Sequence, residues 1–350
     1  MGGYRPRLGD THHMTTNAAI LLSFLQADIE QFLSGEVLAV EHGISRVAVN
    51  ARIRKLEKSG LQFEAVPRRG YRIKSEPPEL HPDLLEAHLH SQEQQLLEGE
   101  SVHLLDETDS TNLEVERRLA AGAEAPLAII AKSQTQGRGR MGRNWHSTHP
   151  GNLYLSIGFR PKTPSTALAS FSLWAGVRLA QALNKMTSLP IKVKWPNDLH
   201  VKGCKLAGIL CEAKFELDRM QTMVFGLGLN VNQTAESLPD GLRTPATTLR
   251  SLLGEPATIH PLTIIVLKAV LDGYQDCQQP GSGKRLQEEF APVDALLGQT
   301  ITTQNGPIKT KGTARGIDEA GNLRLAKPDG SILTVPAGDV TLEKQSNSIR

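Results

Sequence analysis

A proline- and acid-rich stretch, SEPPELHP at residues 75–82, divides the chain into two unequal parts. Three prolines within eight residues interrupt regular secondary structure, so this stretch is predicted to be a linker. The 350 residues exceed the usual domain size of roughly 100 to 200 residues, which predicts two or three domains. The first thirteen residues show no periodicity, so the predicted fold begins at Met14.

Residues 14–74 carry the pattern of a winged helix-turn-helix domain. An amphipathic run, AILLSFLQADIEQFL, precedes two short helical patterns that flank a turn at residues 42–44. Ser45 is the predicted N-cap of the second of these helices, and its inward stripe is Val49, Ile53 and Leu56. Alternating residues on both sides of PRRG at 67–70 predict a two-stranded wing with a basic tip.

The second helix and the wing carry the residues expected to contact DNA. Arg46, Asn50 and Arg54 are spaced four apart, so they line one helix face that could enter a major groove. The alternative is a small helical bundle with an ordinary solvated face, and the basic wing favours DNA binding over it. The predicted DNA-binding residues are Ser45, Arg46, Asn50, Arg54, Arg68 and Arg69.

Charge and cysteine content limit the class of protein. The net charge is only +2, so contact with nucleic acid must come from a local patch. The three cysteines are irregularly spaced, which fits neither a disulfide framework nor a zinc site and predicts a reducing, cytoplasmic location. No apolar run approaches the roughly 18 residues of a membrane span, and the start lacks a signal-peptide pattern, so no membrane association is predicted.

Residues 83–290 alternate between strand-like and helical patterns, which predicts a mixed α/β or α+β core. The predicted strands are LAIIAKSQ, NLYLSIGF, IKVKW and MVFGLGLNVN, and the main predicted helix is FSLWAGVRLAQALNKM. Most candidate chemistry lies in this region.

Residues 134–145 read QTQGRGRMGRNW, with three arginines among three glycines. One explanation is nonspecific binding of nucleic acid. The other is a folded phosphate-binding loop, because glycine lets backbone amides approach a ligand and arginine offers a charged fork that suits phosphate. The spacing is not that of a P-loop, and GLGLN at 226–230 lacks the order of a dinucleotide site.

A second cluster, KWPNDLHVKGCKLAGILCE, spans residues 194–212. Asp198 is a candidate partner for hydrated Mg²⁺, and Lys205 supplies a point charge for a carboxylate or an α-phosphate. This set suits adenylation, in which no enzyme nucleophile is needed. Each motif alone could be a surface turn, a helix cap or a solvated loop, and their joint occurrence favours a site.

In this order, GRGRMGRNW, KWPNDL, KLAGIL and GLGLNVN resemble the catalytic domain of biotin protein ligases. With the winged helix-turn-helix upstream, residues 18–343 resemble the bacterial proteins that combine biotin ligase and biotin operon repressor. The resemblance implies that biotin and MgATP form biotinyl-5′-AMP, and that biotin then passes to a lysine of the biotin carboxyl carrier protein of acetyl-CoA carboxylase. It also implies a ligand-promoted homodimer that binds operator DNA of biotin biosynthesis genes.

The resemblance also assigns roles to individual residues. The implied catalytic residues are Lys205, Arg138 and Arg140, and Asp198 is the implied metal-binding residue. Biotin binding is implied for Ser110, Thr111, Asn112, Gln134, Arg138, Gly139, Arg140, Lys205, Gly208, Gly226 and Gly228. Adenylate or ATP binding is implied for Arg138, Arg140, Arg143, Trp145, Lys194, Asn197 and Asn230. Met141 departs from the family pattern, since the best-known members carry arginine there.

Residues 291–344 contain short alternating runs separated by turns such as EAGN and PDG, which predicts a small barrel. The family resemblance implies an SH3-like domain, and the whole chain is predicted to be α+β. Because no titratable cluster lies in this region, it is expected to be a structural cap.

Two other functions share part of this pattern. A lipoate ligase would use the same fold and the same adenylation chemistry, but the glycine-arginine loop argues against it. A regulator that only senses biotin would not need Lys205, Asp198 and both loop arginines, which are all present.

Overall fold

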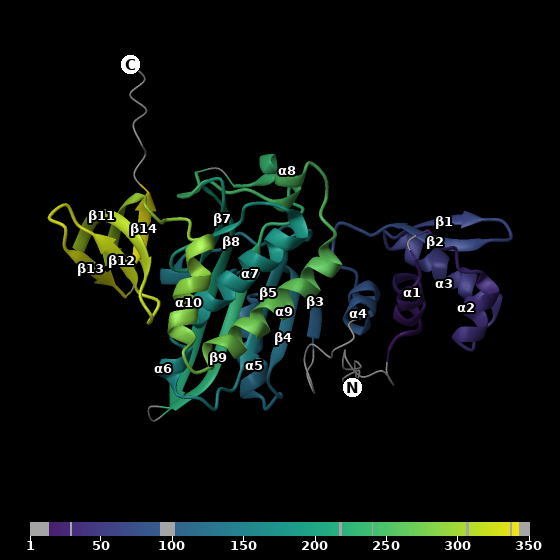
Figure 1. The fold of residues 1–350 in the computed structure, drawn as a ribbon. Helices are drawn as coiled ribbons and strands as arrows, with labels where there is room; N and C mark the ends of the chain where they lie inside the picture. Colours follow the sequence, from purple (N-terminus) through teal and green to yellow (C-terminus); the bar gives the residue numbers. More distant parts are fainter. Residues whose placement is uncertain are drawn as a thin grey trace, which may run out of the picture.

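The computed structural model describes residues 14–28, 30–91, 102–216, 219–239, 241–305, 308–336 and 338–342. The thirteen residues left out of the predicted fold lie outside these ranges. Figure 1 shows a helical N-terminal part, a central sheet with its helices, and a small C-terminal sheet at the opposite end. The predicted α+β class is confirmed. Within the described residues, no helix combines the length and the apolarity that a membrane crossing requires.

The N-terminal part has the predicted winged helix-turn-helix order. Each of its three helices begins after a serine or threonine whose side chain accepts a backbone N–H, which satisfies one of the unpaired donors at the helix start. Ser45 is such an N-cap, and Val49, Ile53 and Leu56 are buried, as predicted. The elements are α1 (Thr16–Gln26), α2 (Gly35–Glu41), α3 (Arg46–Lys58), β1 (Gln62–Val66) and β2 (Gly70–Ser75).

The central part is a seven-stranded sheet in the order β3-β4-β5-β9-β8-β7-β6. Strands β3 and β4 are parallel and the other neighbours are antiparallel. The strands are β3 (Val102–Thr108), β4 (Leu127–Gln134), β5 (Leu153–Phe159), β6 (Lys192–Lys194), β7 (Asp198–Val201), β8 (Cys204–Glu216) and β9 (Arg219–Leu229).

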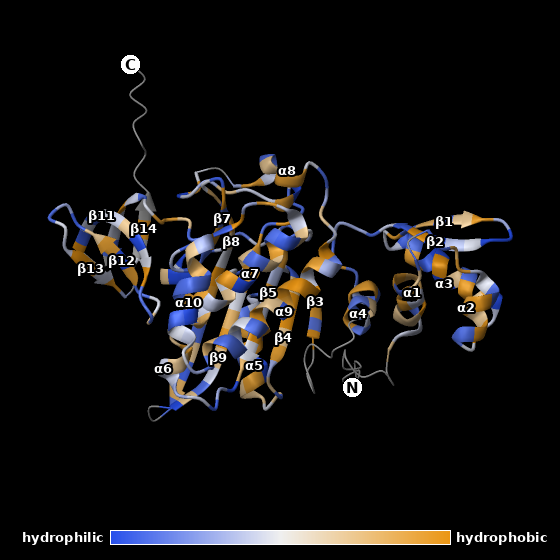
Figure 2. Cartoon of the chain, viewed as in Figure 1, coloured by the Kyte–Doolittle hydropathy of each residue, from blue (hydrophilic) through white to orange (hydrophobic). Residues whose placement is uncertain are grey.

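Helices cover both faces of this sheet. Ala128 and Ile130 of β4 share a core with α7 and α9, whereas Leu127 and Ile129 pack with α5 on the other face. Burial on both faces explains why β4 is an uninterrupted apolar run. Figure 2 shows this concentration of hydrophobic residues in the sheet. The helices are α4 (Pro82–His90), α5 (Thr111–Ala120), α6 (Ser165–Leu168), α7 (Phe171–Thr187), α8 (Leu249–Leu253), α9 (Ile259–Cys277) and α10 (Ser282–Phe290), with 3₁₀ turns η2 (Arg140–Gly142), η3 (Ala235–Ser237) and η4 (Ala291–Val293).

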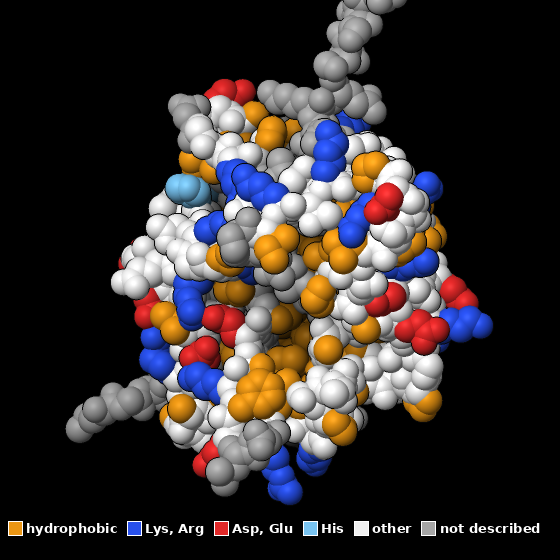
Figure 3. Space-filling model, turned by 90° about the vertical axis from the view of Figure 1, so that its left-hand side faces the viewer, with side chains coloured by type: hydrophobic (Ala, Val, Ile, Leu, Met, Phe, Trp, Pro, Cys, Tyr) orange, Lys and Arg blue, Asp and Glu red, His pale blue; other side chains and the backbone are white. Residues whose placement is uncertain are grey.

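The C-terminal part is the predicted small β domain, an SH3-like antiparallel sheet in the order β13-β12-β11-β10-β14. Its buried hydrophobic residues belong to the same core as those of the central sheet. Trp195 Nε1, from the turn after β6, donates to Gly321 O at 3.0 Å. On the face in Figure 3, basic and acidic side chains are interspersed around a hollow with hydrophobic walls. The strands are β10 (Thr300–Asn305), β11 (Ile308–Ile317), β12 (Leu323–Ala326), β13 (Ile332–Val335) and β14 (Asp339–Leu342).

Helix α4 begins at Pro82, the last residue of the predicted linker, and packs on two sides. Leu84 and Ala87 are in one cluster with Leu21 of α1, whereas Leu85 belongs to the core of the central part. Helix α4 therefore packs against both the N-terminal part and the central part. The predicted domain boundaries are 14–74, 75–82, 83–290 and 291–344. We retain these boundaries as a proposal.

The linker is held by a buried cluster of one carboxylate and two histidines. Glu76 accepts from His88 Nε2 at 3.0 Å and from His260 Nδ1 at 2.9 Å. His260 is fully buried, and its Nε2 accepts the backbone N–H of His81 at 2.9 Å, so its ring is neutral. Burial raises the pKa of Glu76, but the hydrogen bonds from His260 and His88 outweigh it and lower the pKa to about 2.

Acid should weaken this junction over a pH range set by Glu76. The unfolded pKa is near 4.5 and the folded one about 2, so the stabilisation is complete above pH 4.5 and is lost as the pH falls toward 2. The shift corresponds to on the order of 3 kcal/mol. Glu76→Gln should therefore melt at a lower temperature than the wild type at neutral pH, and thermal unfolding should show this difference shrinking in acid. A constant difference across that range would contradict the prediction.

Candidate active site and nucleic-acid interface

A cavity of about 320 Å³ opens beside β8 and β9 of the central sheet. Its walls come from the start of α5, the loop after β4, the β6–β7 hairpin and the C-terminal β14. Every residue predicted to bind biotin, adenylate, ATP or metal lines it: Ser110, Thr111, Asn112, Gln134, Arg138, Gly139, Arg140, Arg143, Trp145, Lys194, Asn197, Asp198, Lys205, Gly208, Gly226, Gly228 and Asn230. The fold thus brings together segments that are more than a hundred residues apart in the chain.

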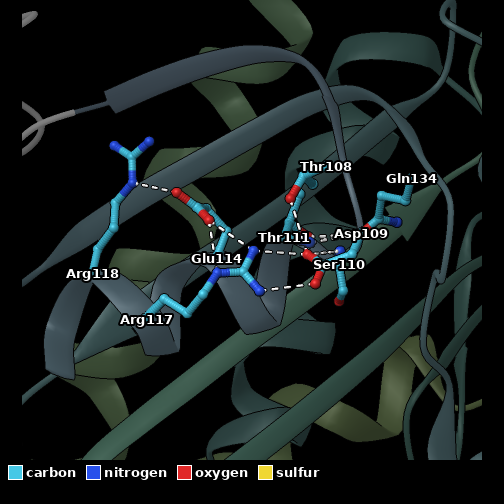
Figure 4. Close-up of polar contacts among 8 residues, drawn as sticks. All are labelled: Thr108, Asp109, Ser110, Thr111, Glu114, Arg117, Arg118 and Gln134. Atoms are coloured by element: carbon cyan, nitrogen blue, oxygen red, sulfur yellow. Dashed lines mark hydrogen bonds and ion pairs between the residues drawn. The ribbon is translucent and has the colours of Figure 1, made fainter. Parts of the chain in front are cut away.

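Polar side chains at the start of α5 form a connected, buried network. Gln134 Oε1 accepts from Thr111 N at 2.8 Å and from Thr111 Oγ1 at 3.1 Å, as Figure 4 shows from the side of α5. Ser156 Oγ lies 2.6 Å from Asn112 Oδ1 and 2.7 Å from Thr111 Oγ1. These contacts fix the side chains before a ligand enters, which reduces the entropy lost on binding.

An outer layer of charges supports the same turn (Figure 4). Asp109 Oδ1 accepts from Ser110 N at 2.7 Å, and Arg117 donates to both Asp109 oxygens at 2.8 Å. The Arg117 guanidinium holds the pKa of Asp109 well below its usual range. Neither Asp109 nor Arg117 was predicted from the sequence, because an acid and a base eight residues apart are common in any polar segment.

Two glycines of β9 leave room for the walls of the cavity. A Cβ at Gly226 would lie 2.1 Å from Asn112 Oδ1, and one at Gly228 would lie 2.2 Å from Trp145 Nε1. The Trp145 ring also has Lys205 Nζ at 5.2 Å from its centroid, within reach of a cation–π interaction. Side chains at these two glycines would therefore displace Asn112 or Trp145.

The glycine-arginine loop folds over the cavity and is not a solvated tract. Gly139 N donates to Arg143 O at 2.7 Å and Trp145 N to Gly137 O at 2.8 Å, so the loop is closed by its own backbone. Arg140 Nη1 donates to Asn197 Oδ1 at 3.1 Å. Met141 is 72% exposed and is absent from the cavity wall. Methionine in place of the family's arginine therefore removes a positive charge from the protein surface and not from the cavity.

Lys205 and Asp198 form an ion pair across β7 and β8, with Nζ 2.8 Å from Oδ1. Burial raises the pKa of Asp198, but His200 and the Lys205 ammonium lower it more, so the carboxylate is ionised at neutral pH. In the described part of the chain, no group of three or more His, Cys, Asp or Glu side chains could hold a metal. One cavity carboxylate fits Mg²⁺ that takes its remaining ligands from phosphate and water.

Part of the cavity wall carries no recognisable motif. The segment after β9 contributes Gln233, Leu238, Leu242 and Thr244, and Lys205 N donates to Pro245 O at 2.7 Å. Val340 of β14 also lines the cavity, so the C-terminal domain is part of the wall. The irregular segment after β9 has no periodicity, and β14 belongs to a region without a titratable cluster, so neither part of the wall was predicted.

The predicted DNA-binding residues lie on α3 and on the wing. Ser45, Arg46, Arg54, Arg68 and Arg69 are exposed. Asn50 is half-buried and donates to Tyr71 Oη at 2.9 Å, which ties α3 to β2. The Arg69 guanidinium lies 4.4 Å from the centre of the Phe32 ring. The structure thus presents four arginines and a serine on one helix and the adjoining hairpin.

Comparisons with known proteins match all three parts of the chain. Residues 19–72 match the HTH domain family, residues 104–230 the Biotin/lipoate A/B protein ligase family, and residues 296–342 the Biotin protein ligase C terminal domain family. The chain is similar to the bifunctional ligase/repressor BirA of Bacillus spizizenii, with 32% identity over 321 residues that cover 91% of this chain and 96% of that protein.

Two further proteins each match about two thirds of the chain. The biotin–[acetyl-CoA-carboxylase] ligase of Paracoccus denitrificans is 31% identical over 247 residues, covering 68% of this chain and 98% of that protein. The structure resembles the biotin protein ligase from Aquifex aeolicus in complex with biotin and ATP, with a TM-score of 0.60, 28% identity and coverage of 69% and 98% of the two chains. The cavity, the helix-turn-helix domain and these matches together show that the chain belongs to the biotin protein ligase family, in its bifunctional ligase/repressor group.

Proposed function

We propose that this chain is an ATP-dependent biotin protein ligase. A carboxylate oxygen of biotin attacks the α-phosphorus of ATP, the bond from that phosphorus to the bridging oxygen breaks, and pyrophosphate leaves. The amine of a lysine on the biotin carboxyl carrier protein then attacks the acyl carbon, an amide forms and AMP departs. The single observation that carries this proposal is that one cavity holds the Lys205–Asp198 pair, the loop arginines and the α5 polar network.

The cavity divides into two regions with different chemistry. The α5 end presents neutral donors and acceptors, which suit the ureido group of biotin, and the glycines of β9 provide a flat wall. The loop end presents Arg138, Arg140 and Arg143, which suit phosphate. Lys205 lines the same cavity, with its ammonium beside Asp198 and the Trp145 ring. There it would offset the repulsion between the biotin carboxylate and the α-phosphate.

Mg²⁺ bound to the phosphates would neutralise charge on the leaving pyrophosphate. Asp198 is the residue that would contact it, directly or through water. Lys194 and Asn197 lie on the same hairpin as Asp198, at the loop side of the cavity. We place the reaction in the cytoplasm, because the three cysteines are free thiols.

The proposed activity is tested by incubating the chain with MgATP, biotin and a carrier domain, and then weighing the carrier by mass spectrometry. Addition of the mass of biotin supports the proposal. In a parallel incubation with lipoate, a gain of the lipoyl mass in its place would identify a lipoate ligase. If neither biotin nor lipoate caused release of pyrophosphate, the remaining function would be that of a regulator that only senses biotin.

We also propose that the N-terminal domain represses biotin biosynthesis genes through operator DNA. One helix-turn-helix reads one half-site, so operator binding calls for a symmetric pair of domains. Ordering of the loops around biotinyl-5′-AMP would promote a homodimer. Sedimentation with and without biotin and MgATP tests this step, and a monomer under both conditions would contradict it.

Arg46→Ala and Arg54→Ala should each weaken binding of operator DNA while biotin transfer stays at the wild-type rate. Each arginine is exposed on α3 and outside the cavity, and loss of one contact typically costs about 1 to 3 kcal/mol. Electrophoretic mobility shifts and carrier biotinylation measure the two effects. Lys58→Ala, at the last turn of the same helix, is the control for a general loss of charge. Equal loss of both activities would show that the two functions are not separable.

A further inference from the structure

Glu212 lies on β8 outside the cavity wall and contacts two of the residues that form that wall. Its Oε1 accepts from Arg138 Nη2 at 2.8 Å, and its Oε2 accepts from Asn112 Nδ2 at 2.8 Å. One carboxylate therefore connects the glycine-arginine loop to the start of α5. The proposed reaction gives Glu212 no role of its own.

The contact with Asn112 determines how that amide is oriented. Ser156 Oγ is 2.6 Å from Asn112 Oδ1, and Glu212 receives a hydrogen from Nδ2. Because the carboxylate can only accept, the NH₂ group must face Glu212 and the carbonyl oxygen must face Ser156. Glu212 thus fixes the orientation of the Asn112 amide at the cavity wall.

The contact with Arg138 holds one side of the loop. The loop is closed by its own backbone between Gly137 and Trp145, and two arginine side chains tie it to residues outside the loop. Arg138 reaches Glu212 on β8, and Arg140 reaches Asn197 in the β6–β7 hairpin. Release of either tie would let the loop lift from the ligand.

We propose that Glu212 is a positioning residue that latches the glycine-arginine loop over the bound adenylate. It touches neither biotin nor phosphate, and acts by holding Arg138 and Asn112 in place. This inference rests on the proposed ligase function and adds a determinant of how long the adenylate is retained.

Glu212→Gln should speed release of biotinyl-5′-AMP about tenfold. The substituted amide keeps one acceptor for two donors and loses the charge, which removes one charge-assisted hydrogen bond. Loss of such a bond typically weakens retention of a ligand roughly 10- to 100-fold. The Arg138 side chain is 40% exposed, and solvent weakens an exposed ion pair, so we expect the lower end of this range. Release is measured by chasing preformed radiolabelled adenylate with unlabelled biotin. The affinity for biotin alone should change less, since the loop arginines face the phosphate end.

A double-mutant cycle separates a latch from a general structural effect. Arg138→Gln removes the same pair from the loop side, so Glu212→Gln should add less than about twofold to the release rate in that background. Glu216→Gln, at the exposed end of the same strand, should release adenylate at the wild-type rate. Wild-type release by Glu212→Gln, or additive effects in the cycle, would overturn the latch while the ligase function stands. If the wild-type chain forms no adenylate, both proposals fail.

Discussion

Lys205→Ala should slow formation of biotinyl-5′-AMP by roughly 10²- to 10³-fold, the usual cost of removing one preorganised group that stabilises developing charge. The ammonium lies 2.8 Å from Asp198 Oδ1 and beside the Trp145 ring, so it is fixed where carboxylate and phosphate would meet. Its removal also takes away the ammonium paired with the buried Asp198 carboxylate, which makes a site that must accept two anions more negative. Pyrophosphate release with saturating biotin and MgATP measures the effect.

The matched control is Lys214→Ala, on the same strand. Lys214 pairs with Glu116 at 2.7 Å and is mostly exposed, so its loss should leave pyrophosphate release unchanged. Normal pyrophosphate release by Lys205→Ala with failed transfer to the carrier would move Lys205 from the first chemical step to the second. Normal rates in both steps would contradict its catalytic assignment.

Arg140→Gly should make the protein leak its intermediate. Biotinyl-5′-AMP is a mixed anhydride that acylates amines and water, so the site must shield it until the carrier lysine arrives. Loss of one charge-assisted hydrogen bond to phosphate should weaken retention on the order of 10- to 100-fold. Loss of the Arg140–Asn197 contact would also free the loop from the β6–β7 hairpin. Streptavidin blots of mixed bystander proteins, incubated with the variant, biotin and MgATP, should show diffuse labelling.

Met141→Gly is the control within the same 3₁₀ turn. Met141 is exposed and already has a left-handed φ of 55°, which glycine adopts without strain, so this variant should keep wild-type retention. If Arg140→Gly lost affinity for DNA and released adenylate at the wild-type rate, the alternative of nonspecific nucleic-acid binding by the loop would be correct. The leak is expected because Arg140 lines the cavity and donates to Asn197, another cavity residue.

Regular elements were predictable because their residues repeat with the period of the structure. The predicted strand LAIIAKSQ has the same bounds as β4. Ser45 is the N-cap of α3, as predicted, and its side chain accepts a hydrogen bond from the backbone of that helix. The end of β9 was predicted too far along the chain. Val231 N donates to the side chain of Asn152 at 2.8 Å, and this partner, 79 residues away, cannot be read from local alternation.

For the candidate site, motif residues were predictable and their supports were not. Lys205, Asp198 and the loop arginines belong to recognisable stretches, whereas Glu212 and Ser156 resemble any polar residue on a strand. Their importance comes from register: Ser156 is opposite Gly226, and Glu212 is opposite Val224, on strands that meet only in the fold. Leu242, in the irregular segment after β9, and Val340, on β14, were missed for the same reason, because only the fold brings them to the cavity.

Helix α4 connects the DNA-binding domain to the central part rigidly, where a flexible linker would let the two move independently. It is buried against α1 on one side and against the central core on the other, and the Glu76–His260 cluster braces the approach to it. If two copies associate through their central parts, their recognition helices will stand a set distance apart. We therefore expect the tolerated gap between operator half-sites to be narrow, and to be inherited from the geometry of the ligase pair more than from the DNA-binding domains.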